Sequence, residues 1–155
     1  MKVGMIGLGR TGEGMSRRML AKGIEVWGYS STNYENACGQ YEAGHLSGCV
    51  TSIEYLVRAI KTDNKKFTSA GRIPGIFQIT CPEQKAEDTL DELLPLLEEG
   101  DIIIDHSTSD ITKCQELELY CSKLGISYIF SGVYGATYAI NACPKIFQSL
   151  SPGNV

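Results

Sequence analysis

Long hydrophobic runs are missing from the sequence, since no apolar segment approaches the roughly 18 residues that a membrane-spanning helix requires. The apolar segment Met1–Leu8 is short, and Arg10 follows it closely. It therefore lacks the long apolar region and the small-residue cleavage site of a secretory signal peptide. These absences argue against a helical membrane anchor, and we expect a cytoplasmic protein with no membrane partner.

Paired cysteine motifs are also missing. The six cysteines stand at positions 38, 49, 81, 114, 121 and 143, and none forms a C-x-x-C pair or the paired spacing of a zinc site. We therefore expect no metal site. An even number is compatible with a disulfide scaffold, but a chain of this length can build a core without one, which favours reduced thiols. Cys114 and Cys121 lie seven residues apart in a helical pattern, where core packing on one face explains them.

Positive charge is in the minority, with 14 Lys and Arg residues against 18 Asp and Glu residues and a net charge of -4. This balance argues against a nucleic-acid partner, yet it leaves room for a local basic site that binds a phosphate. The length of 155 residues, with 43% hydrophobic and 21% charged residues, is typical of a soluble globular domain with its own core.

Segments with the patterns of strands and helices alternate along the chain. The expected strands are Lys2–Ile6, Ile24–Tyr29, Gly48–Val50, a segment within Ile73–Thr80, Ile102–Ile104 and Ile126–Phe130. Helical patterns fall between these strands, at 13–22, at 34–43, from the residues after Thr51 to Ile60, around 90–97 and around 117–124. This alternation predicts an α/β fold of the Rossmann type, with a doubly wound, mainly parallel sheet and helices on both faces.

Two local signals refine the expected helices. Thr51 and Glu54 have the spacing of a capping box, which predicts that a helix begins after Thr51. Pro95 lies inside an amphipathic leucine pattern, so it is expected to kink or restart that helix. The region Gly132–Val155 loses periodicity and ends like a frayed terminus.

The turn Gly7–Gly12 directly follows the first expected strand and opens the first expected helix. In that context, G-x-G-x-x-G is the fingerprint of a dinucleotide-binding turn. Gly7 permits the tight turn, Gly9 lets the backbone approach a pyrophosphate, and Gly12 lets the helix pack closely. The helix N-terminus then offers its amides to the phosphates. We expect a nicotinamide dinucleotide held by Gly7, Leu8, Gly9, Arg10, Thr11 and Gly12.

The end of the second expected strand carries hydroxyls and no carboxylate. An Asp or Glu there would bind the ribose 2′-hydroxyl of NAD. Ser30, Ser31 and Thr32 can instead donate hydrogen bonds to a 2′-phosphate, and Arg10 can supply positive charge. The pattern favours NADP as the cofactor, with NAD left open. In the alternative interpretation, Ser30–Thr32 cap the next helix and the selectivity is weak.

Polar residues also follow the fifth expected strand, at the edge where ligands bind in open α/β sheets. Ser107 and Thr108 can hydrogen-bond a substrate or a nicotinamide amide, and the imidazole of His106 can act as an acid or a base. We weigh this equally against a second interpretation, in which Ser109 or Asp110 caps the following helix and His106 has no role.

Thr80-Cys81-Pro82 ends the fourth expected strand, near the same edge of the sheet. Cys81 is expected to be a packing residue rather than a nucleophile, because no base partner can be named for it. The lysines at 65 and 66 and Arg72 are expected to lie in a solvated loop.

With these residues in place, the chain resembles the 6-phosphogluconate dehydrogenase family, within the β-hydroxyacid dehydrogenase superfamily. It is most similar to the shorter bacterial branch of that family. The resembling stretches are MKVGMIGLGR at 1–10, KGIEVWGY at 22–29, NKKFTSAGRIPGIF at 64–77 and DELLPLLEEGDIIID at 91–105. The likeness weakens from residue 107 and is nearly lost after residue 136.

The resemblance implies an NADP- or NAD-dependent oxidoreductase of the pentose phosphate type, with a sugar acid as its substrate. Gly7, Gly9 and Gly12 match the cofactor fingerprint of the family. Residues Thr80, Cys81 and Pro82 match a loop that contacts the nicotinamide side of the cofactor. Ser107 and Thr108 stand in the substrate-binding motif, in a form similar to the Ser-Thr of hydroxyisobutyrate dehydrogenases.

Two departures from the family bear on activity. Val133-Tyr134-Gly135-Ala136 stands in place of a Val-Ser-Gly-Gly substrate motif, so a serine is replaced by Tyr134 and a glycine by Ala136. The resemblance also places the catalytic lysine of the family on a second, helical domain, and no residue here matches it. We expect a dinucleotide-binding domain at 1–131, a divergent tail at 132–155 packed on or beside it, and no helical catalytic domain.

Three interpretations follow. The first is the NADP(H)-binding domain of a 6-phosphogluconate dehydrogenase-like oxidoreductase, inactive or weakly active alone. The second is a non-catalytic nucleotide-binding or partner-binding protein derived from that family, which Tyr134 and Ala136 favour. The third is a truncated, non-functional product. Loss of a packing partner would expose apolar surface near Tyr134–Phe147, so we expect a homodimer or weak oligomer.

Overall fold

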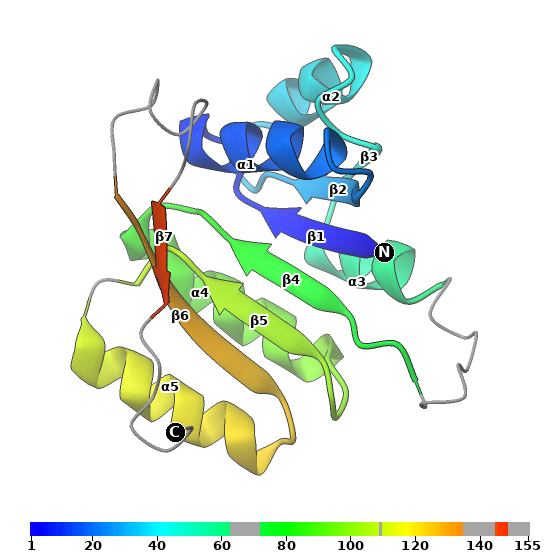
Figure 1. Cartoon of the computed structure of the whole chain (residues 1–155). Helices are drawn as coiled ribbons and strands as arrows, with labels where there is room; N and C mark the ends of the chain where they lie inside the picture. The colour runs from blue at the N-terminus through cyan, green and yellow to red at the C-terminus, as the bar shows by residue number, and fades with distance from the viewer. Residues whose placement is uncertain (63–71, 109, 135–144, 149–155) are drawn as a thin grey trace.

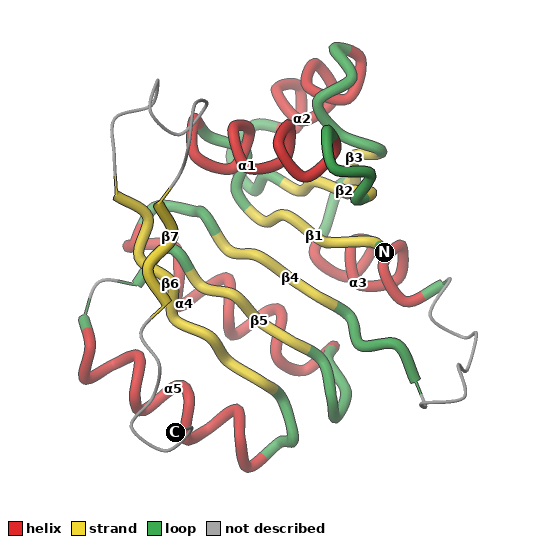
Figure 2. The backbone as a smooth tube through the Cα atoms, in the orientation of Figure 1, coloured by secondary structure: helices red, strands yellow, loops and turns green. Residues whose placement is uncertain are grey.

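The computed structural model describes residues 1–62, 72–108, 110–134 and 145–148 (Figure 1). Seven strands form one sheet: β1 (Lys2–Ile6), β2 (Glu25–Tyr29), β3 (Gly48–Val50), β4 (Ile76–Ile79), β5 (Ile102–Asp105), β6 (Ser127–Tyr134) and β7 (Lys145–Gln148). The helices are α1 (Arg10–Leu20), α2 (Tyr34–Glu42), α3 (Ile53–Lys61), α4 (Glu83–Leu93), the 3₁₀ helix η1 (Leu94–Leu96) and α5 (Ile111–Lys123) (Figure 2).

The sheet has the order β3-β2-β1-β4-β5-β6-β7, and β1 to β6 run parallel. The chain winds outward from β1 to β3, crosses back to β4 beside β1, and then winds outward the other way. Ile6 and Ile79, the last residues of β1 and β4, are register partners. Gly7 and Thr80 therefore leave the sheet next to each other, at the point where the winding reverses and where ligands bind in folds of this class.

Helices cover both faces of the sheet. Figure 1 shows α1 and α2 on one face and α3, α4 and α5 on the other. The smaller core, under α1 and α2, consists of Met5, Leu8, Met15, Val26, Ala37 and Leu46. The larger core lies under the other helices, where the fully buried Phe77, Leu56 and Ile103 meet. The doubly wound α/β fold expected from the alternation of patterns is thus confirmed. No helix of the described residues combines the length and apolar character needed to cross a membrane.

The start of α3 corrects one local expectation. Ser52, not Thr51, is the N-cap, because its side chain accepts a 3.1 Å hydrogen bond from the Tyr55 amide. The Thr51 capping box is therefore wrong. A helix that begins after Ser52 places its apolar residues on one buried face, and these are Ile53, Leu56, Val57 and Ile60. The predicted break at Pro95 is confirmed, since α4 ends at Leu93 and only η1 continues through the proline.

The end of the chain adds a strand that the pattern did not predict. β7 pairs antiparallel with the end of β6, with Gly132 opposite Phe147. β7 is only four residues long and follows β6 after a gap of ten residues, so no alternating pattern of useful length marks it in the sequence. The expected domain boundary at residue 131 falls within β6.

Candidate functional site

The turn after β1 requires glycine at its first position. Gly7 has a φ of +93°, and its amide donates a 2.9 Å hydrogen bond to the Tyr29 carbonyl oxygen at the end of β2. A Cβ added at Gly7 would lie only 2.7 Å from the Cys81 nitrogen. Any larger residue would be strained by this backbone conformation and would also collide with the end of β4.

The other two glycines of the fingerprint have opposite surroundings. A Cβ at Gly12 would overlap the Gly7 carbonyl oxygen and lie 2.7 Å from the Thr80 Oγ1, because α1 packs directly on the turn. A Cβ at Gly9 would meet no atom of the described residues within 4 Å. Packing of the chain therefore explains Gly7 and Gly12, whereas Gly9 faces open space that is free for a ligand.

Thr80 holds the turn from the end of β4. Its hydroxyl donates a 2.6 Å hydrogen bond to the Gly7 carbonyl oxygen. This contact joins the two central strands at the reversal point of the sheet. Thr80, expected to contact a cofactor, thus also shapes the turn.

Two amide side chains of α2 hold the next residue of the turn. Gln40 Nε2 donates to the Leu8 carbonyl oxygen at 2.8 Å, and Asn36 Nδ2 donates to the same oxygen at 3.3 Å. Gln40 is buried, so this support lies inside the fold. Neither residue was singled out from the sequence, although two amide side chains spaced one helical turn apart were a usable signal.

The N-terminus of α1 opens toward the same space. Gly9 is its N-cap and offers no side-chain cap, while its carbonyl oxygen accepts the Glu13 amide at 2.9 Å. The amides of the first turn, from Arg10 to Gly12, precede the Glu13 amide, which is the first with an acceptor inside the helix. These donors and the positive end of the helix dipole favour an anion here.

A pocket of about 460 Å³ lies over the carboxyl ends of β1, β2 and β4. The residues that line it are Ile6, Gly7, Leu8, Gly9, Arg10, Thr11, Ser30, Ser31, Thr32, Asn33, Asn36, Thr80, Cys81, Pro82, Lys85 and Thr89. They include two cations, Arg10 and Lys85, and no carboxylate. Of the expected cofactor-binding residues only Gly12 is not among them, because it lies beneath the turn. Lys85 and Thr89 were not expected, although Lys85 falls in the first turn of the helix after Pro82.

The hydroxyls at the end of β2 line this pocket and do not cap α2. The N-cap is Asn33, whose side chain accepts a 2.9 Å hydrogen bond from the Asn36 amide. The interpretation of Ser30–Thr32 as helix caps is therefore wrong. Ser31 and Thr32 are exposed and free to meet a ligand.

Cys81 connects the pocket with the loop after β5. Its sulfur lies 3.6 Å from the Ser107 Oγ and 3.7 Å from the Thr89 Oγ1, and it packs against the larger core. Ser107 does not line the pocket, but it adjoins the pocket wall through Cys81.

Thr108 lies apart from the pocket. It is buried, and its hydroxyl donates a 2.7 Å hydrogen bond to Asp105 Oδ2. The same carboxylate oxygen accepts the Tyr128 hydroxyl at 2.6 Å, while Asp105 Oδ1 accepts the Ser107 amide at 2.7 Å. Burial and then the charge of Asp105 raise the pKa of Tyr128 well above its usual range, so the phenol remains a donor. Thr108 therefore holds the loop and borders a separate cavity between α4 and α5.

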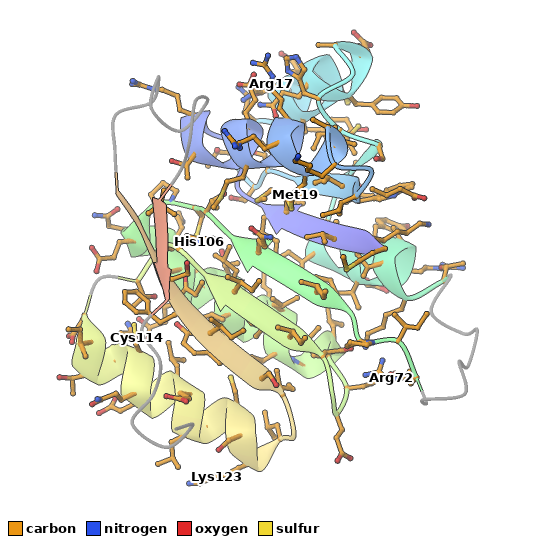
Figure 3. All side chains as sticks on the ribbon, in the orientation of Figure 1. Arg17, Met19, Arg72, His106, Cys114 and Lys123 are labelled. Carbon is orange, nitrogen blue, oxygen red and sulfur yellow. The ribbon has the colours of Figure 1, made fainter. Side chains whose placement is uncertain are left out.

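His106 bridges strands on the face that also carries α1. Its Nδ1 lies 3.1 Å from the Ser131 carbonyl oxygen, and its Nε2 lies 3.3 Å from Gln78 Oε1. Gln78 in turn contacts the sulfur of Met19, and Figure 3 shows Met19 and His106 on this side of the sheet. Burial lowers the pKa of His106, so the ring is neutral at pH 7. The helix that follows is capped by Asp110, and Ser109 lies outside the described residues.

Comparison with known proteins identifies the family. The family described as the NAD binding domain of 6-phosphogluconate dehydrogenase matches residues 2–149. The chain belongs to this family. The match corrects the expectation that the likeness is nearly lost after residue 136, because family-level similarity extends through β7.

Individual relatives agree with this assignment. The decarboxylating 6-phosphogluconate dehydrogenase of Dictyostelium discoideum is 30% identical over 155 residues, covering 97% of this chain and 29% of that protein. The structure of Plasmodium falciparum 6-phosphogluconate dehydrogenase shares the fold, with a TM-score of 0.77 at 18% identity over 98% of this chain and 31% of that chain. Psf3, solved with NADP+ and 2-OPP, has a TM-score of 0.73 at 26% identity over 97% of this chain and 49% of its own. The chain thus spans under a third of the curated relative's length.

Proposed function

We propose that this chain is the NADP(H)-binding domain of a 6-phosphogluconate dehydrogenase-like oxidoreductase. The observation that carries the proposal is the open side of Gly9 beside the uncapped N-terminus of α1. A pyrophosphate needs both features, because its oxygens must come within hydrogen-bonding distance of backbone amides. Family membership supports the same ligand class.

The residues that line the pocket favour NADP over NAD. Ser30, Ser31 and Thr32 follow β2 there, and the described lining residues include two cations, Arg10 and Lys85, and no carboxylate. A carboxylate at the end of β2 would repel a 2′-phosphate, whereas hydroxyls and a guanidinium can bind one. The NADP+ named with Psf3 and with the Plasmodium falciparum enzyme is consistent with this preference.

A bound nicotinamide would supply hydride transfer, and the residues that line the pocket would bind and orient it. Thr80, Cys81 and Pro82 lie where the nicotinamide side of the cofactor is proposed to bind, and Ser107 adjoins them for a sugar-acid substrate. No residue of the described chain is assigned as the proton donor that such a reaction needs. We therefore propose that the chain alone is inactive or weakly active.

A second candidate is a nucleotide-binding protein without catalytic activity, which senses the cofactor or pairs with another subunit. It is favoured by Tyr134 and Ala136, which replace the serine and a glycine of the substrate motif. Both candidates require the same cofactor pocket and differ in turnover. Self-association through the surface near Tyr134–Phe147 stays a prediction, since those side chains lie outside the described residues.

Calorimetric titration of the purified chain with NADPH and NADH tests the proposal. We expect saturable binding of both dinucleotides, with NADPH the tighter ligand. Failure of both ligands to bind would overturn the cofactor assignment, and tighter binding of NADH would overturn the argument from Ser30–Thr32. Oxidation of 6-phosphogluconate at a rate typical of dehydrogenases would contradict the proposed lack of activity.

A further inference from the structure

Two cysteines on neighbouring elements, α2 and β3, lie in contact. Cys38 is on α2 and Cys49 is on β3, and their sulfurs are 3.5 Å apart. Both residues are half-buried, so the pair lies near the surface and remains reachable by a small solute. Neither of them lines the pocket over the glycine turn.

The other described cysteines lack this arrangement. Cys114 and Cys121 are on the buried face of α5 in the larger core, and the Cys81 sulfur contacts the hydroxyls of Thr89 and Ser107. Two thiols already in contact need a movement of only about 1.5 Å to reach the bonded distance of roughly 2 Å. The proximity of Cys38 and Cys49 therefore distinguishes a pair suited to disulfide chemistry from thiols that serve packing.

The surroundings of the pair bear on its reactivity. Burial, together with hydrogen bonding to Cys38, raises the pKa of the Cys49 thiol, and the nearby Glu42 adds to this. A raised pKa lowers the fraction of Cys49 present as thiolate, which slows attack by this thiol. The hydroxyl of Tyr34, one helical turn before Cys38, interacts with both thiols and has its pKa raised to about 12 by Cys38. It therefore stays protonated and can donate to a developing thiolate.

We propose that Cys38 and Cys49 form a reversible disulfide by exchange with a low-molecular-weight disulfide such as that of glutathione. The Cys38 thiolate attacks one sulfur of that disulfide, whose S–S bond breaks and releases one thiol. The Cys49 thiolate then attacks the Cys38 sulfur and releases the second thiol. Two electrons pass from the cysteine pair to the small disulfide, and the two cysteine protons end on the released thiols.

The bond would fasten α2 to the edge strand of the sheet. β3 is that edge strand, and it pairs with β2 alone among the described strands. A covalent link between residues 38 and 49 restricts the unfolded chain and raises the thermal stability of the folded form. The proposal concerns these two side chains only, so its outcome does not depend on which dinucleotide binds, or whether one does.

The test uses the whole chain, reduced and then equilibrated with mixtures of reduced and oxidised glutathione. After acid quenching and alkylation in denaturant, we expect two thiols to be lost together and the mass before alkylation to fall by about 2 Da, with a peptide linking Cys38 to Cys49. The melting temperature should rise by roughly 5–10 °C on oxidation and return on reduction.

Cys38→Ser and Cys49→Ser should each abolish the linked peptide and the rise in melting temperature. Cys143→Ser is the matched control and should leave both unchanged. The proposal is overturned if oxidation yields only glutathione adducts, if the linked peptide joins Cys143 to either thiol, or if the rise in melting temperature persists in Cys49→Ser.

Discussion

The hydroxyl of Thr80 donates a 2.6 Å hydrogen bond to the carbonyl oxygen of Gly7, and this contact joins β4 to the turn that follows β1. Both residues lie at the switch point of the sheet, one step beyond the Ile6–Ile79 register pair. The contact makes the shape of the glycine turn depend on a side chain that is more than 70 residues distant in the sequence. The local motif Gly7–Gly12 therefore does not determine the shape of the turn by itself.

Removing that hydroxyl tests the dependence. Thr80→Val keeps the size and branching of the side chain but leaves the Gly7 carbonyl oxygen without this donor, and we expect a loss of about 1 kcal/mol in the free energy of unfolding. Urea unfolding measures the change. Thr80→Ser retains the donor and should recover most of the stability. Equal stability of Thr80→Val and the wild type would show that the contact contributes nothing.

The contrast between Gly9 and Gly12 gives a second prediction. Gly9→Val places its side chain in open space at a backbone conformation that valine accepts, so the free energy of unfolding should stay within about 0.5 kcal/mol of the wild type. Dinucleotide binding should nevertheless be lost, because the side chain occupies the space over the α1 amides. Calorimetry and urea unfolding of the same preparation separate the two effects.

Gly12→Ala serves as the matched comparison. Its methyl group would overlap the Gly7 carbonyl oxygen, so this variant should lose about 2–3 kcal/mol of stability or fail to fold. If Gly9→Val binds NADPH like the wild type, the open side of Gly9 is not the pyrophosphate site. If Gly12→Ala is as stable as the wild type, α1 can shift away from the turn more easily than the structure indicates.

The alternation of apolar runs with amphipathic segments was enough to predict the parallel sheet and its two helical layers. Contacts between distant segments were harder to predict. Asn36 and Gln40 stand one helical turn apart, which was a local signal, but nothing near them in the sequence identifies Leu8 as their partner, and nothing within Lys145–Gln148 identifies β6. The N-cap of α3 was predicted at the wrong residue for a related reason. Thr51 and Ser52 are both good N-cap residues, and the buried face of α3 decides between them.

Arg10 provides a test of cofactor selectivity. It is exposed and lines the same pocket as Ser30, Ser31 and Thr32, so its guanidinium is available to a ligand phosphate. Arg10→Gln should weaken NADPH binding by about tenfold or more and change NADH binding much less, because a charge-assisted hydrogen bond is lost for the phosphorylated ligand only. Arg17→Gln, two turns further along α1 and outside the pocket, is the control. Equal weakening of both ligands would place Arg10 at the pyrophosphate instead.

At the opposite end of the sheet, Asp101 is fully buried within a cationic cluster. It accepts the Gly75 amide at 2.8 Å and the Glu98 amide at 2.9 Å, and it pairs with Lys61 at 2.9 Å and with Arg72 at 2.8 Å. Burial alone would raise its pKa. The hydrogen bonds from Glu98, Lys61 and Gly75, with the charge of Lys61, outweigh burial and lower the pKa below its ordinary value of 3.8.

Because folding lowers the pKa of Asp101, the direction in which the free energy of unfolding depends on pH is determined. The carboxylate contributes stability that is fully present above the unfolded pKa of 3.8 and is lost as the pH falls through the lower folded value. Asp101→Asn removes the charge and leaves Lys61 and Arg72 without this partner, so it should cost about 3 kcal/mol at pH 7. The difference between wild type and variant should stay constant from pH 7 to about pH 5 and shrink below pH 4.

Urea unfolding across this pH range checks the prediction, with Asp88→Asn as the control. Asp88 is 70% exposed in a 3.4 Å pair with Lys85, so its substitution should change the stability little at any pH. A pH-independent difference between wild type and Asp101→Asn would mean that lost packing, and not lost charge, destabilises the variant. A difference that grows on acidification would mean that the folded pKa of Asp101 lies above the unfolded one, which requires burial to outweigh the hydrogen bonds of Gly75, Glu98 and Lys61.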